Sequence, residues 1–225
     1  RYGWYIIGVI SVACLPLSLW AAARLSVPAQ RNTAAGGIKL HLIWRELAGY
    51  VGFAMGYIVY LTFLSAWMTD QQAPALLISA VWIIMGVALI ASPFVWRGVL
   101  ARHASGKPLA MILTGIAIGS ALPLVLPAGG AVVISAVVFG LCVFMAPGAI
   151  TSFIRQNLPA ESWAAAMSLF TVVFAIAQTA GPFAAGALGD LTGNIGSSLL
   201  AAAAILLTGA AVVAFQKPLP QQDPG

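Results

Sequence analysis

The stretch from Trp163 to Gly193 limits what this chain can fold into more than any other part of the sequence. It holds about 25 nearly uninterrupted apolar and small residues, enough for a helix to cross the ~30 Å hydrocarbon layer of a bilayer. Lipid cannot satisfy the side-chain amide of Gln178, which falls near the middle of this span. The amide belongs to a small or polar stripe at helical spacing, made of Ser168, Thr171, Ala175, Gln178 and Pro182. This pattern predicts a helix with one face toward lipid and another toward protein or a water-filled cavity.

The composition indicates that the whole chain is a membrane protein. Of its 225 residues, 61% are hydrophobic and only 7% are charged, which leaves too little polar surface for a soluble protein. The net charge of +5 does not indicate nucleic-acid binding, because the basic residues lie between apolar runs, as in the loops of membrane proteins. Cys14 and Cys142 lie inside apolar runs without a CxxC or His neighbour, so we interpret them as small hydrophobic residues. No metal or other cofactor is expected.

Run lengths predict an all-α polytopic protein with seven transmembrane helices. The expected spans are Trp4–Ala23, Ile43–Met68, Ala75–Val95, Leu109–Leu126, Gly130–Ile154, Trp163–Leu188 and Ser197–Phe215. A basic linker (25–42) separates the first helix (1–24) from a six-helix bundle (43–216), and a Pro-rich tail (217–225) follows. Because the chain begins at Arg1 rather than Met and is already apolar by Trp4, we expect it to be a piece of a longer protein.

The charged residues predict the orientation. Nine of the ten Lys and Arg residues follow the first, third, fifth and seventh spans, and the other connectors contain none. The positive-inside rule makes that side cytoplasmic, so the C-terminus is predicted to be inside. The acidic residues of the spans and loops fall at membrane edges, where Glu46 and Glu161 are interpreted as solvated charges or as ion-pair partners of Arg45 and Arg155. No charge is expected at mid-membrane.

The second span carries the other candidate binding residues. Tyr50, Phe53, Tyr57 and Tyr60 recur at helical spacing, and tyrosine hydroxyls in a low-dielectric cavity can hydrogen-bond a solute. The alternative is that these tyrosines are interfacial anchors or packing residues. The candidate cavity set is therefore Tyr50, Tyr57, Tyr60, Thr171, Phe174 and Gln178. For Gln178 the alternative is a hydrogen bond to a neighbouring helix, and for Thr171 a hydrogen bond to a carbonyl of its own helix.

Two motifs carry a resemblance to a known family. The loop after the third span, GVLARHASGK at 98–107, resembles the G-x-L-A-D-R-x-G-R cytoplasmic loop of major facilitator transporters, although Arg102 replaces the acidic residue and one extra residue precedes Gly106. The segment GPFAAGALGDLTG at 181–193 resembles the G-P-x-x-x-G-x-L-x-D pattern of the family's eleventh helix. One helix, a basic connector and six further helices are the layout of the family's helices six to twelve.

The resemblance implies secondary active transport of a small solute by alternating access, with two bundles rocking around a midplane site. We would then expect a member of an efflux- or sugar-permease-like subgroup. Its transport would be efflux or proton-coupled, and its location a bacterial inner membrane. The partners would be the solute, the lipid bilayer and the protein's own N-terminal bundle. The second, third, fifth and sixth spans would line the cavity, and the fourth and seventh would face lipid. Residues expected in gating or helix packing are Gly98, Arg102, Gly106, Lys107, Pro147, Gly181, Pro182, Gly186 and Asp190.

Other functional classes fit less well. A seven-helix receptor or sensor shares the predicted topology, but a retinal protein needs a lysine inside its last helix, and Lys217 lies beyond the seventh span. Nothing positively supports a scaffold subunit. An enzyme is not expected, because His41 and His103 lie in connectors and the HExxH, GxSxG and Walker motifs are absent.

Overall fold

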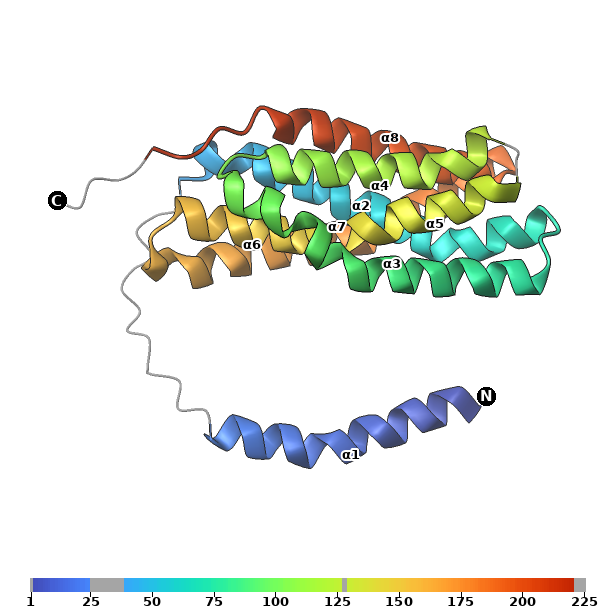
Figure 1. Ribbon diagram of the computed structural model, residues 1–225, viewed down its shortest axis with the longest axis horizontal. Helices are drawn as coiled ribbons and strands as arrows, with labels where there is room; N and C mark the ends of the chain where they lie inside the picture. Colours follow the sequence, from blue (N-terminus) through green and yellow to red (C-terminus); the bar gives the residue numbers. More distant parts are fainter. Residues whose placement is uncertain (1, 25–38, 127–128, 221–225) are drawn as a thin grey trace. The chain divides into compact units, whose positions relative to one another are not determined.

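The computed structural model describes residues 2–24, 39–126 and 129–220, and these form helices joined by short turns (Figure 1). The chain divides into two compact units, Arg1–Gly36 and Gly37–Gly225. The first unit contains helix α1 (Tyr2–Arg24), which includes Pro16 and agrees with the expected first span. Most of the predicted linker lies outside the described residues, and its last three residues already belong to the next helix, which begins at Leu40.

The second unit is a bundle of helices. Its elements are α2 (Leu40–Asp70), α3 (Ala75–Arg102), α4 (Lys107–Val125), α5 (Gly129–Val143), α6 (Met145–Asn157), a 3-10 turn (Ala160–Ser162), α7 (Trp163–Thr192) and α8 (Ile195–Ala214). Six segments of the described chain are long and apolar enough to cross a membrane, with α5 and α6 forming one of them. These segments coincide with the last six spans expected from run length, so the all-α membrane fold is confirmed.

Proline explains the interruption between α5 and α6. Pro147 has no backbone N–H to bond the carbonyl oxygen of Val143, four residues earlier. The helix accordingly breaks at Phe144, and Pro147 then occupies the first turn of α6, where an N–H would be unpaired in any case. The predicted fifth span is thus two consecutive helices, interrupted three residues before the Pro147-Gly148 pair.

Small residues set the close packing inside the bundle. Helix α2 packs along α8, with Gly49 against Val213, Gly52 against Gly209 and Gly56 against Leu206. The glycines of α2 thus form a stripe that seats α8 closely. Helix α4 lies between α5 and α8, α3 packs on α5, and α7 packs on α2.

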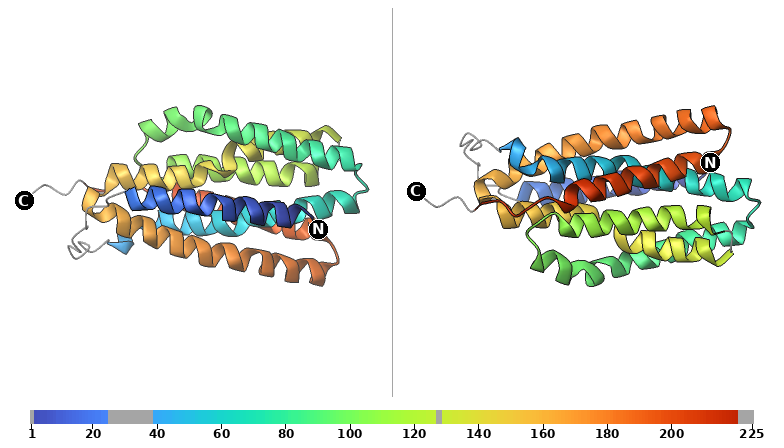
Figure 2. Two further views of the ribbon diagram at one scale, coloured as in Figure 1. Left: turned by 90° about the horizontal axis from the view of Figure 1, so that it is seen from below. Right: turned by 90° about the horizontal axis from the view of Figure 1, so that it is seen from above.

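Helices α3 and α7 are the least covered members of the bundle. They lie on opposite sides of it in both views of Figure 2. In the most apolar window of each, 22% of the residues are buried, against 44–56% in the other spans. Their exposed side chains are large and apolar, for example Ile90 and Phe94 on α3 and Ile176 and Phe183 on α7. A bundle whose two outer helices keep apolar faces uncovered has surface available for lipid or for further helices.

At one end of the bundle, hydrogen bonds join segments that are distant in sequence. Asn157, the last residue of α6, donates to the Ala104 carbonyl at 2.7 Å and accepts from the Leu219 N–H at 2.7 Å. Gly106 N donates to the Gln216 carbonyl at 3.0 Å. The first residues of the predicted tail thus pack on the bundle. The loop between α3 and α4, the end of α6 and the end of α8 consequently meet at one end.

Candidate functional site

Five aromatic rings form a cluster between α2 and α7. Tyr50, Phe53 and Tyr57 come from α2, and Phe170 and Phe174 come from α7. The Phe53 and Tyr57 rings stack with centroids 4.5 Å apart, and Phe174 lies 5.2 Å from Tyr50 and 6.0 Å from Tyr57. Such offset ring pairs hold the two helices in a defined register. The cluster follows from the three-to-four-residue spacing of the rings on each helix.

The polar group of this cluster is the pair Tyr57–Gln178. The Tyr57 hydroxyl donates a hydrogen bond to Gln178 Oε1, 121 residues along the chain. Tyr57 is 8% exposed, whereas Gln178 and Phe174 are half-buried. Among the described residues, the Nε2 group of Gln178 has no hydrogen-bond partner. The pair therefore presents unpaired amide hydrogens beside aromatic rings, at a partly exposed position in the span.

Tyr60 occupies a different environment from the other aromatic residues of its stripe. It is fully buried, its ring stacks 4.2 Å from Phe139, and its hydroxyl lies 2.5 Å from Ser135 Oγ. Ser135 Oγ in turn donates to the Gly119 carbonyl at 2.5 Å. These two hydrogen bonds form a relay from the Tyr60 hydroxyl through Ser135 to Gly119, which connects α2, α5 and α4. Tyr60 therefore lies in the core rather than at a surface that a solute could reach.

Replacing Ser135 with alanine should destabilise the bundle by about 1–3 kcal/mol, because the Tyr60 hydroxyl would remain buried without a partner. Thermal denaturation in detergent measures this. Thr208→Val is the matched control, since its exposed hydroxyl bonds only the Ala204 carbonyl of its own helix at 2.9 Å. Equal melting temperatures for the two variants would contradict a structural role for the relay.

The remaining predicted residues on α7 have more local roles. The Thr171 hydroxyl is exposed and donates to the Met167 carbonyl, one turn back, at 2.8 Å. Asp190, named above for gating or helix packing, is exposed and makes no hydrogen bond with the described residues, although a carboxylate here could accept from backbone amides of the following turn. Asn194 has this role instead, since its side chain accepts from Gly196 N at 2.8 Å. Gly193 ends α7 with a φ of 63°, a conformation that suits glycine.

The two glycines of the GP segment differ. A Cβ on Gly181 would lie 2.7 Å from the Met55 carbonyl oxygen, so α2 and α7 approach closely there, as predicted. A Cβ on Gly186 would meet no atom within 4 Å. Pro182 is half-buried within the continuous helix α7 and does not interrupt it.

The loop motif at 98–107 has one buried residue, Gly106, among exposed and half-buried ones. Gly98 and Arg102 are exposed on the last turns of α3, and Lys107 is exposed at the start of α4. Gly106 is buried and is the N-cap residue of α4. Within the described ranges neither Arg102 nor Lys107 has an ion-pair partner. The motif thus positions the start of α4 through Gly106, and its basic side chains stay in contact with solvent.

Several polar residues that connect helices or are buried in the bundle were not predicted from the sequence. Ser135, Asn157 and Gln216 connect helices through their side chains, and Glu46 is buried at the start of α2. The interpretation of Glu46 as a solvated or ion-paired charge is wrong, because its side chain is 1% exposed and forms no ion pair with any described residue. The available signal was its position six residues into a long apolar helix, on the same face as Gly49 and Phe53.

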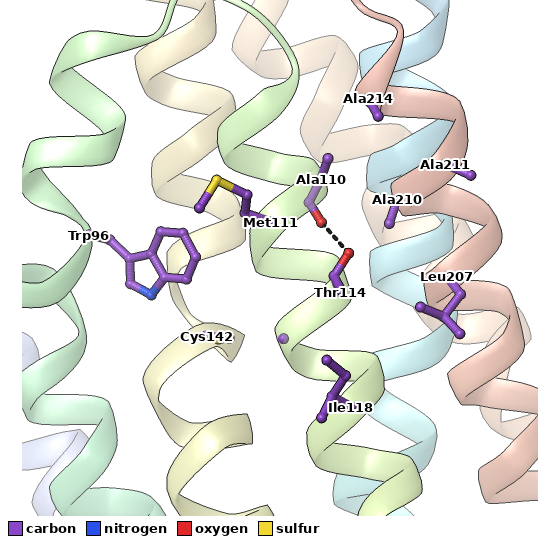
Figure 3. A pocket seen from close by; sticks show the side chains of 11 residues that line it. Trp96, Ala110, Met111, Thr114, Ile118, Cys142, Leu207, Ala210, Ala211 and Ala214 are labelled. Atoms are coloured by element: carbon purple, nitrogen blue, oxygen red, sulfur yellow. Dashed lines mark hydrogen bonds between the residues drawn. The ribbon is translucent and has the colours of Figure 1, made fainter.

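A large groove elsewhere on the bundle has a different chemistry. It has a volume of about 650 Å³ and is lined by α3, α4, α5 and α8, with Trp96 facing Met111 across it (Figure 3). The Thr114 hydroxyl in this groove donates to the Ala110 carbonyl at 2.8 Å, so it is already paired within its own helix. The groove contains none of the predicted cavity residues. It offers apolar contact with little polar recognition, which suits lipid chains better than a solute.

No cluster of metal-ligating side chains is found among the described residues. Comparison with protein families matches residues 1–214 to the family described as "Uncharacterised MFS-type transporter YbfB". No curated protein matches the chain.

The family match covers almost the whole sequence, and the six long apolar segments agree with a multi-pass membrane transporter. The chain therefore belongs to the YbfB-type family of major facilitator superfamily transporters.

Proposed function

We propose that the chain contributes half of a binding site for a small neutral solute, which is moved across the membrane by alternating access. The observation that carries this proposal is the Tyr57–Gln178 pair with its unpaired amide nitrogen beside five aromatic rings. An amide donor and a tyrosine hydroxyl can orient one acceptor group of a solute, while the rings contact its apolar body. Charged recognition is disfavoured, because no Lys, Arg, Asp or Glu belongs to the cluster.

The orientation is part of the proposal. The basic residues of the bundle lie near the helix ends joined by Asn157 and Gln216, and the turns after α2, α4 and α7 contain no Lys or Arg. The positive-inside rule then makes the Asn157–Gln216 end cytoplasmic, and with it the C-terminus. The membrane would be a bacterial inner membrane, and a second bundle of the same protein would supply the other half of the site. Transport would be active, with efflux or proton coupling as its mode.

The test is transport by the full-length native product in proteoliposomes, with a panel of neutral aromatic solutes that carry one hydrogen-bond acceptor. We expect Tyr57→Phe and Gln178→Ala each to lower transport efficiency by about tenfold to a hundredfold for the solute that the wild type moves best. Tyr60→Phe is the matched control, because it also removes a tyrosine hydroxyl from α2, but from a ring that is buried in the core. It should lower thermal stability and leave the rate per folded molecule unchanged.

The outcome that contradicts the proposed site is wild-type transport by both Tyr57→Phe and Gln178→Ala. If only charged solutes were transported, the amide and the rings would not be the recognition elements, and the neutral-solute proposal would be wrong.

A further inference from the structure

Two buried oxygen atoms at the Asn157–Gln216 end of the bundle lack hydrogen-bond donors. Glu46, in the second turn of α2, is 1% exposed, and Gln216, which follows the C-cap residue of α8, is 4% exposed. Glu46 Oε2 and Gln216 Oε1 are both inaccessible and have no hydrogen-bond partner among the described residues. Both are acceptors. An unpaired buried acceptor is costly, and a buried carboxylate without a partner far more so.

Both side chains lie against the same glycine. A Cβ built on Gly106, the N-cap residue of α4, would lie 2.9 Å from Glu46 Oε2 and 2.7 Å from Gln216 Cβ. The Gln216 amide is held on its other side, because Nε2 donates to the Leu42 and Lys217 carbonyls, each at 2.9 Å. The amide nitrogen is therefore occupied, and Oε1 is the atom of Gln216 that still needs a donor.

Among the residues that the structure describes, no cation neutralises Glu46. Basic side chains occur on every element that packs here: His41 and Arg45 on α2, His103 and Lys107 around the start of α4, and Lys217 after α8. None forms an ion pair with Glu46 within the described residues, and the Arg45 guanidinium lies over the Trp44 ring at 5.0 Å. His103 Nδ1 lies 3.1 Å from the Val99 carbonyl, whereas His41, Lys107 and Lys217 are exposed. The end of α6, a helix that also packs on α2 and α4, carries Arg155, whose guanidinium lies over the Trp163 ring at 5.1 Å.

We propose that Glu46 is a proton-binding site and that the neutral carboxylic acid donates a hydrogen bond to Gln216 Oε1. One hydrogen then satisfies both unpaired oxygens and removes the buried charge. The bond ties the start of α2 to the end of α8 beside the N-terminus of α4. Loss of the proton leaves a carboxylate facing an amide oxygen, which repels it, so release of the proton loosens the contact of these three helix ends. The inference does not depend on the transport proposal.

Infrared spectroscopy of the full-length native product in lipid tests the proton directly. A protonated carboxylic acid gives a carbonyl stretching band that a carboxylate lacks. We expect such a band in the wild type, a shift of it in heavy water, and its loss in Glu46→Gln. Glu161→Gln is the matched control, because Glu161 is exposed on the 3-10 turn and its replacement should leave the band unchanged. A wild-type spectrum without the band, as for a water-bridged carboxylate, would overturn the proposal.

A second measurement covers the case in which Glu46→Gln removes the band only by disturbing the fold. The side-chain amide that Glu46→Gln introduces can itself donate to Gln216 Oε1, so this variant should keep the bond at every pH. The melting temperature of the wild type should fall as pH rises and the carboxyl loses its proton, whereas that of Glu46→Gln should fall less. Parallel pH profiles for wild type, Glu46→Gln and Glu161→Gln would show that no proton at Glu46 stabilises the bundle.

Discussion

Gly106→Ala is expected to destabilise the bundle by about 3 kcal/mol or more. A Cβ at this position would overlap the Val213 carbonyl oxygen. That atom belongs to the backbone of α8 and cannot rotate away as a side chain would. The loop cannot withdraw either without losing the hydrogen bond from Gly106 N to the Gln216 carbonyl. The start of α4 and the end of α8 must therefore separate.

Gly98→Ala is the matched control, because Gly98 belongs to the same sequence motif but has open space around it. Inside helix α3, alanine in place of glycine should stabilise by roughly 0.5–1 kcal/mol. Thermal unfolding in detergent, followed by size-exclusion chromatography, compares the two variants. If Gly106→Ala melts together with Gly98→Ala, the close approach of α4 and α8 described above is incorrect.

The helices were predictable from sequence because lipid imposes a strict rule on them. A segment that crosses a bilayer must be apolar along its whole length and must pair every backbone group internally. The bounds of α7 show how far this extends: the apolar run predicts 163–188, and the helix continues through one polar turn to Thr192, where Gly193 ends it. The interruption before Pro147 follows from the sequence in the same way, because the effect of the missing N–H is local.

The candidate site was predictable only in its parts. Helical spacing identified Tyr57 and Gln178 separately, but their hydrogen bond depends on α2 and α7 lying side by side, and two segments 121 residues apart carry no local signal of that. Tyr60 shows the opposite case. It shares the aromatic spacing of Tyr57, yet a modest rotation around α2 directs it to Phe139 and Ser135 on α5. Side-chain type and spacing do not distinguish the two environments.

Polar residues at helix ends were the least predictable. A Glu or Gln at a membrane edge is ordinarily solvated, so sequence favours the exposed interpretation. Glu46 and Gln216 are buried instead, because the loop at Gly106 packs on the end of α8 and lies against both side chains. That packing depends on the absence of a single Cβ, and composition gives no sign of it.

Gly181→Ala is expected to disturb the candidate site as well as the fold. The added Cβ would lie 2.7 Å from the Met55 carbonyl oxygen and 3.1 Å from Met55 Cα, so α7 must move away from α2. Such overpacking typically destabilises by about 1–3 kcal/mol. Gln178 lies one turn earlier on α7, so the same movement lengthens its bond to Tyr57. Both the melting temperature and the transport rate should fall.

Gly186→Ala separates the effect of contact from that of helix propensity. Gly186 belongs to the same segment of α7, but a Cβ there meets no atom, so alanine should be tolerated or slightly stabilising.

The combination of Gly181→Ala with Tyr57→Phe tests whether Gly181 affects transport through the Tyr57–Gln178 hydrogen bond. If widening the α2–α7 contact impairs transport by breaking the Tyr57–Gln178 bond, the double variant should transport no worse than the more impaired single variant. Independent, multiplying losses would mean that Gly181 affects transport by another route, such as the movement of α7 during the transport cycle.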